Sequence, residues 1–207
     1  MAKKKSFIIV TLLITVILGI GVGVVAKQAI DKKNLELFDA AKKYKQDKTV
    51  IAVVDGDKIY QYQVDIQLAS QKLSQANMAE AGGDPTLITQ RTEDEILDEL
   101  IRNTVILQEA KKQKLTAKYS DAKAYQEEQF AAIKAANDDQ SRFFEQYRKE
   151  MGWTEEEHLK QAALGWQESM TRTNLYNKYL EDNPDATDET WKKHVDSLVE
   201  NADIEYK

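Results

Sequence analysis

Two histidines, His158 and His194, could support acid–base or metal chemistry, but their spacing favours neither. They fall on separate predicted helices, in neither a His-x-x-x-His nor a His-Glu-x-x-His pattern. Glu155, Glu156 and Glu157 precede His158, but consecutive helical residues point in different directions and cannot hold one ion together. We therefore interpret these four residues as a solvated first helical turn, where the helix dipole favours acids.

Other patterns typical of enzymes yield no catalytic set. The chain has no cysteine, which excludes thiol nucleophiles, disulfides, iron–sulfur clusters and cysteine zinc sites. It contains no Gly-x-Ser-x-Gly elbow and no Gly-x-x-x-x-Gly-Lys phosphate loop. Asp55-Gly56-Asp57 lacks the remaining ligands of a calcium-binding loop. We expect no enzymatic activity, no metal and no cofactor.

Large apolar side chains form the more informative pattern. Five fall within residues 143–153 and two more follow one turn apart: Phe143, Phe144, Tyr147, Met151, Trp153, Trp166 and Met170. Aromatic and methionine side chains suit a surface that binds many apolar segments, because they are large and adaptable. They equally suit a hydrophobic core. The sequence leaves both interpretations open: an apolar client-binding surface, or core.

The first 26 residues predict a membrane anchor. A basic start at residues 3–5 precedes an uncharged apolar run over residues 7–26. Twenty helical residues span roughly 30 Å, the thickness of a bilayer core. A cleaved signal peptide usually has a shorter apolar region, so an uncleaved anchor is expected, with cleavage after Ala26 as the alternative. The Gly19-x-x-x-Gly23 spacing would let two such helices approach closely in a homodimer.

Charge limits the choice of partner but leaves the orientation open. The formal net charge is −6, and residues 3–5 supply three lysines, so the rest of the chain carries −9. This argues against nucleic acid, because phosphate binding needs a cationic surface. Lys27, Lys32 and Lys33 follow the apolar run and roughly balance the basic start, so charge alone does not orient the anchor.

After the anchor, the pattern predicts a mostly α-helical chain with a small β-sheet. Residues 27–48 are expected to form a charged helical stalk, or alternatively a helix on the membrane surface. Residues 49–62 predict a hairpin around Asp55-Gly56, since glycine tolerates the positive φ of a tight turn. Helical spacing then follows over residues 63–79, 92–114, 120–136, a short segment ending at Gly152, 154–180 and 188–200.

Local signals mark where these helices begin and how the chain closes. Thr92 with Glu95, and Thr154 with Glu157, have the spacing of capping boxes, which satisfy the free N–H groups of a helix start. Residues 202–206 alternate like a strand. A lone hairpin is marginally stable, so this last strand is expected to join it. Residues 49–207 are thus expected to be one domain.

The order of these segments resembles the SurA/PrsA-type extracytoplasmic chaperones. The similarity is carried by the strand and turn at residues 51–59, by the leucine-rich helix ending in Gln108-Glu109-Ala110-Lys111, by Gly152-Trp153-Thr154-Glu155-Glu156-Glu157, and by the closing helix and strand from Trp191. The resemblance implies a SurA-N-like helical domain at residues 49–207 that binds unfolded exported polypeptides without a cofactor. It also implies an extracytoplasmic position for this domain and a cytoplasmic N-terminus.

The sequence departs from many of these relatives at one place. Only ten residues separate Leu180 from Trp191, far too few for the parvulin prolyl-isomerase domain that many relatives carry. We therefore expect a membrane-anchored holdase without isomerase activity. Two alternatives stay open: a membrane-anchored adaptor that docks one specific partner, and a degenerate prolyl-isomerase relative.

Overall fold

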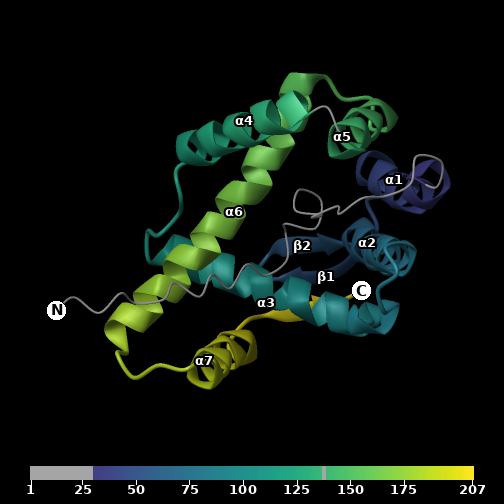
Figure 1. Ribbon diagram of the computed structural model, residues 1–207. Helices are drawn as coiled ribbons and strands as arrows, with labels where there is room; N and C mark the ends of the chain where they lie inside the picture. The colour runs from purple at the N-terminus through teal and green to yellow at the C-terminus, as the bar shows by residue number, and fades with distance from the viewer. Residues whose placement is uncertain (1–29, 137–138) are drawn as a thin grey trace.

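The computed structural model describes residues 30–136 and 139–207 (Figure 1). The predicted anchor at residues 7–26, with Gly19 and Gly23, lies outside the described residues. Among the helices that are described, none is long and apolar enough to cross a membrane. The elements are, in order, α1 (Ile30–Gln46), β1 (Val50–Val54), β2 (Asp57–Tyr60), α2 (Gln61–Glu80), the 3-10 helix η1 (Pro85–Leu87), α3 (Glu93–Lys112), α4 (Tyr119–Ala136), α5 (Asp139–Glu150), α6 (Glu155–Asp182), α7 (Asp188–Glu200) and β3 (Ile204–Tyr206).

The two ends of the described chain meet in a three-stranded antiparallel sheet of order β2-β1-β3. Asp55 and Gly56 take φ values of +46° and +88°, which form the tight turn between β1 and β2. On the other side of β1, Val53 pairs with Glu205. The predicted hairpin and the predicted addition of the closing strand are both confirmed.

One face of this sheet packs on α3. Ala52, Val54 and Ile59 from the hairpin are buried against Ile101 and Val105 of α3. Side chains from α7 and β3 complete the cluster, so the last part of the chain closes over the first: Leu198, Val199, Ala202 and Ile204. Burial of each large aliphatic side chain contributes about 1.5–3 kcal/mol. The mostly α-helical fold with a small sheet is confirmed.

Helix α1 is part of the folded body. A free-standing stalk at residues 27–48 would leave its sparse apolar side chains in solvent. Instead, Leu37 is 1% exposed and Phe38 0% exposed. Leu37 packs with Ala69 and Leu73 of α2, and Phe38 packs with Tyr147 of α5. The predicted helix is present in the structure. It is not a free stalk, because its side chains near residue 40 pack on α5 near residue 147.

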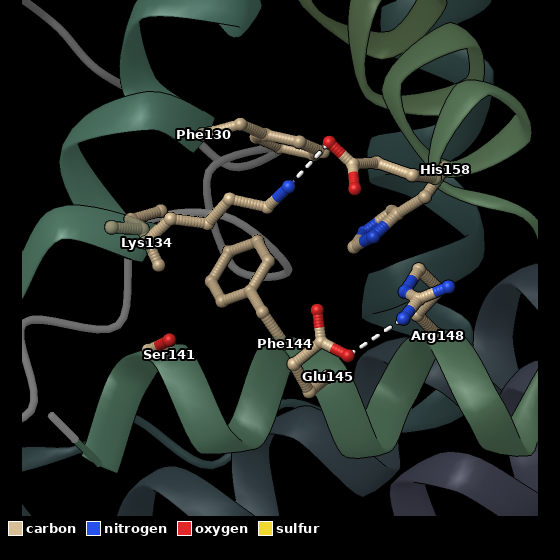
Figure 2. Close-up of a pocket in the computed structure, with 9 residues that line it drawn as sticks. Phe130, Lys134, Ser141, Phe144, Glu145, Arg148 and His158 are labelled. Atoms are coloured by element: carbon tan, nitrogen blue, oxygen red, sulfur yellow. Dashed lines mark hydrogen bonds and ion pairs between the residues drawn. The ribbon is translucent and has the colours of Figure 1, made fainter. Parts of the chain in front are cut away.

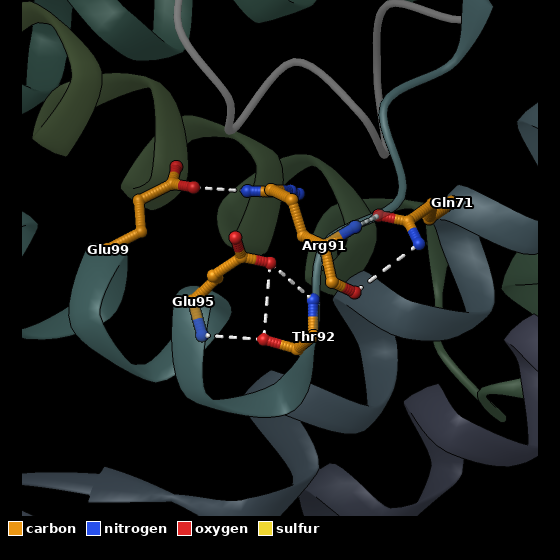
Figure 3. Close-up of polar contacts among 5 residues, drawn as sticks. All are labelled: Gln71, Arg91, Thr92, Glu95 and Glu99. Carbon is orange, nitrogen blue, oxygen red and sulfur yellow. Dashed lines mark hydrogen bonds and ion pairs between the residues drawn. The ribbon is translucent and has the colours of Figure 1, made fainter. Parts of the chain in front are cut away.

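Both predicted capping boxes are present. In α3, the Thr92 hydroxyl accepts from the Glu95 N–H at 3.2 Å, and the Glu95 carboxylate accepts from the Thr92 N–H at 2.7 Å. The start of α3 is also bonded to α2, because the backbone N–H of Arg91 donates to the Gln71 side chain at 2.9 Å (Figure 3). The Arg91 guanidinium pairs with Glu99 of α3. In α6, Thr154 and Glu157 make the equivalent reciprocal pair.

The long helix α6 joins the two ends of the molecule (Figure 1). It packs against α4 and α3. The turn between those helices is fixed to it by hydrogen bonds: the Thr171 hydroxyl accepts from the Ala117 N–H at 3.1 Å, and the Gln167 amide donates to the Ala117 carbonyl at 2.8 Å. The N-terminal half of α6 is therefore held beside α4, α5 and α1, where the aromatic side chains gather.

Candidate functional site

Four of the seven predicted apolar site residues lie together between α1, α5 and α6. Tyr147 and Met151 are buried, at 5% and 4% exposed, and Phe143 and Trp153 pack beside them on Phe38. The Phe38 ring centroid lies 5.6 Å from that of Phe143 and 5.8 Å from that of Tyr147. Burial raises the pKa of Tyr147 to about 12. Tyr147 and Met151 are therefore core residues, and together with the half-buried Trp153 they form a wall.

That wall encloses a cavity of about 180 Å³ between α1, α2, α5 and α6. Its lining is mainly apolar: Ala41, Tyr44, Ile66, Tyr147, Met151, Trp153, His158, Gln161, Ala162 and Gly165. We call it the aromatic cavity. Tyr44, Trp153 and Gln161 are only half-buried, so the aromatic cavity reaches the surface on their side. Such a lining offers apolar contact and a single amide rather than a nucleophile or an acid–base pair.

His158 forms part of this wall, which corrects the expectation that it belongs to a solvated turn. It is 5% exposed, whereas the three preceding glutamates are exposed as expected. Its ring centroid lies 4.9 Å from that of Phe130 and 5.6 Å from that of Tyr147. Burial lowers the pKa of His158 to about 4, with a smaller effect from the Arg148 guanidinium. His158 is thus a neutral aromatic packing residue at pH 7.

A second, much smaller pocket lies on the other side of His158 (Figure 2). Its volume is about 30 Å³, which holds about one water molecule and no side chain. Two ion pairs flank it: Lys134 with Glu155 at 2.5 Å, and Arg148 with Glu145 at 2.6 Å. The first pair connects α4 to α6, and the second lies within α5, on the same side of the His158 ring.

A known protein family matches most of this chain, including the hairpin, the helices that follow it and the capped start of α6. The family described as the SurA-like N-terminal domain matches residues 2–163. The chain belongs to this family. The family expected from the sequence is confirmed, although the match begins earlier and ends earlier than residues 49–207. No curated relative and no solved structure matches the chain.

The remaining three predicted residues of this SurA-like chain lie elsewhere. Phe144 faces the smaller pocket and packs on Phe130, with ring centroids 5.8 Å apart. Trp166 stacks on Tyr125 of α4 at 4.6 Å and lines a separate cavity of about 270 Å³ along α4. Met170 is half-buried one turn further along α6 and lines none of these three cavities. The predicted set is therefore not one continuous surface.

The first two helices of the SurA-like chain supply site residues that the sequence did not indicate. Tyr44 of α1 and Ile66 of α2 line the aromatic cavity. The centroid of the Tyr44 ring lies 5.5 Å from that of Tyr62 and 6.4 Å from that of Trp153, so Tyr44 packs between the start of α2 and the segment that follows α5. A pattern of Ala41 and Tyr44 on one face of α1 could have indicated this role. The expectation of a free stalk does not include this face, because a stalk would leave it in solvent.

Within residues 30–136 and 139–207, no group of three or more metal-ligating side chains is close enough to hold an ion. The aromatic cavity is therefore the best-supported candidate functional site of this SurA-like protein, and apolar binding is the chemistry that its lining allows.

Proposed function

We propose that this protein is a membrane-anchored holdase that binds unfolded exported polypeptides and assists their folding. The observation that carries the proposal is the aromatic cavity, in a chain of the SurA-like N-terminal domain family. Folded proteins usually fill their interiors, and an apolar space that reaches the surface has room for an apolar side chain of another chain. A holdase requires only such contact and neither a cofactor nor ATP.

The lining also suits clients of varied sequence. Tyr44, Met151 and Trp153 give large, polarisable contact areas with little directional demand. Gln161 adds an amide that can bond the backbone common to all polypeptides. These properties support broad apolar recognition better than docking of one specific partner, which is the adaptor alternative.

Holdase activity is tested with the full chain in lipid nanodiscs. A chemically denatured client is diluted into buffer and its aggregation is followed by light scattering, with empty nanodiscs as the control. We expect a several-fold molar excess of the protein to slow aggregation. Unchanged scattering, together with a single stoichiometric partner in crosslinking, would favour the adaptor alternative.

A cavity-filling variant ties the activity to the site. Gly165→Leu places a large side chain in the lining of the aromatic cavity and should weaken aggregation suppression. Leucine favours helices over glycine by about 1 kcal/mol, and urea unfolding of the variant checks that it stays folded. Asn177→Leu adds the same side chain to an exposed position of α6 and should leave suppression unchanged.

The anchor and its orientation are part of the proposal. Residues 7–26 would span the membrane with residues 30–207 outside the cytoplasm, where exported clients emerge. Protease digestion of cells stripped of their wall tests this. The proposal predicts digestion of the exposed domain while a cytoplasmic control stays protected. Protection of both would place the domain in the cytoplasm and favour the adaptor.

Absence of isomerase activity completes the proposal. The segment between α6 and α7 runs only from Asn183 to Thr187, which leaves no room for a parvulin domain there. We expect the protein to leave the rate of a proline-limited refolding reaction unchanged. Acceleration that depends on protein concentration would instead favour the degenerate-isomerase alternative.

A further inference from the structure

Two exposed lysines contact half-buried and buried residues that line the aromatic cavity. The Lys45 ammonium donates to the Met151 carbonyl at 2.7 Å and lies 5.9 Å from the centre of the Trp153 ring. The Lys48 ammonium donates to the Tyr44 carbonyl at 2.8 Å and lies 5.3 Å from the centre of the Tyr44 ring. Both positive charges therefore touch residues that line the cavity.

These lysines differ from their neighbours in α1. Lys42 pairs with Glu150 at 2.6 Å and Lys43 pairs with Asp65 at 2.6 Å, so both are neutralised. Within residues 30–136 and 139–207, Lys45 and Lys48 form no ion pair with a carboxylate, although Lys45 makes a minor contribution to the lowered pKa of Glu157. An ammonium has three donors, so each lysine keeps donors for a further acceptor.

This local positive charge stands out because the chain after residue 26 carries −9 overall. A carboxylate at the cavity entrance would meet two cations that have no carboxylate of their own. A second basic group there would meet repulsion from both. The entrance is thus complementary to an acidic side chain.

The size of the aromatic cavity limits what enters. An apolar cavity of about 150 Å³ is large enough to hold a benzene molecule. The aromatic cavity, at about 180 Å³, therefore has room for one phenylalanine, leucine or methionine side chain. Gln161 is placed to bond the backbone on which that side chain is carried.

We propose that the aromatic cavity binds an extended polypeptide segment in which one large apolar side chain lies next to an acidic residue. The apolar side chain occupies the cavity, and the carboxylate pairs with Lys45 and Lys48 at its entrance. This rests on the proposed holdase function and narrows its clients to segments with this pairing.

Three short fluorescent peptides test the pairing by anisotropy, against the full chain in nanodiscs of uncharged lipid. They carry Phe-Asp, Phe-Lys or Ala-Asp at the centre of an otherwise identical Gly-Ser sequence. We expect Phe-Asp to bind about three- to tenfold more tightly than Phe-Lys at low salt, given the strength of exposed charge pairs. Ala-Asp should bind at least about tenfold more weakly, since it buries no large side chain.

Charge reversal assigns the selectivity to the two lysines. Lys45→Glu/Lys48→Glu should reverse the order of Phe-Asp and Phe-Lys. Lys118→Glu/Lys192→Glu carries the same net charge at exposed positions outside the cavity and should keep the wild-type order. If the first double variant misfolds, Lys45→Gln in its place should reduce the preference, and 0.5 M salt should do so in the wild type.

Equal binding of Phe-Asp and Phe-Lys, no binding of either, or a preference that survives charge reversal would overturn the proposal. Failure of the holdase function is seen separately. A protein that slows client aggregation but binds the two peptides equally would keep its function and lose only this selectivity.

Discussion

Burial of neutral His158 makes the fold sensitive to acid. Its pKa is lowered from the ordinary 6.5 to about 4, chiefly by burial. The charged groups around it compensate only in part: Arg148 lowers the pKa further, and the smaller effects of Glu145 and Glu155 raise it. Lys134 neutralises Glu155 from α4. Between pH 6.5 and 4, His158 therefore binds a proton more readily in the unfolded chain than in the folded protein.

The sign and size of the effect follow from this difference. The stabilising contribution is fully present above pH 6.5 and is lost as the pH falls toward 4. Each pH step of one within that window costs about 1.4 kcal/mol, so lowering the pH from 7.5 to 5 costs about 2 kcal/mol from His158 alone. A single domain has a stability of about 5–15 kcal/mol, so this loss is readily measured.

The assay is urea unfolding of residues 27–207 at pH 7.5 and pH 5, followed by tryptophan fluorescence. His158→Phe keeps an aromatic ring among aromatic neighbours but removes the titrating group, so it should lose about 2 kcal/mol less than the wild type on acidification. The matched control is Asn177→Leu at an exposed position of α6, which keeps His158 and should show the same loss as the wild type.

Equal losses in the wild type and His158→Phe would refute this reasoning. They would mean that His158 is accessible to protons in the folded state, and that α5 and α6 do not pack as described.

Three further changes test the packing. Phe38→Ala should lower the free energy of unfolding of residues 27–207 by about 3–5 kcal/mol, and a change below about 1 kcal/mol would mean that α1 is a free stalk after all. Thr154→Ala removes the cap of α6 and should cost about 1 kcal/mol in the same urea titration, whereas no loss would contradict the capping box. Gly56→Ala places a β-carbon at a φ of +88°; it should cost about 1 kcal/mol, and an unchanged midpoint would contradict the turn.

The elements set by short-range interactions could be predicted from the sequence. The hairpin depends on β-branched residues on either side of Asp55-Gly56, and both capping boxes depend on residues three apart. Gly152, which follows α5, has a φ of +59°, as expected for a residue that ends a helix. In each case the residues that determine the geometry are close together in the chain.

The docking of α1 and the aromatic cavity could not be predicted in this way. Phe38 meets Tyr147, and Tyr44 meets Trp153, across about a hundred residues of chain. Nothing near α1 in the sequence indicates these contacts. The apolar side chains of α1 are also too sparse to suggest a buried face. The burial of His158 is equally hidden from the sequence, because its partners Phe130 and Phe144 come from α4 and α5 rather than from its own helix.

The most direct test of the central claim is a photocrosslinker at position 161, in the wall of the aromatic cavity. The full chain carrying it is mixed with several chemically denatured clients and with the same clients in their folded state. We expect crosslinks to many unfolded clients and few to folded ones, and none from a crosslinker at the exposed position 206, which is outside the cavity lining. Crosslinks to one folded partner only, or equal yields from both positions, would contradict it.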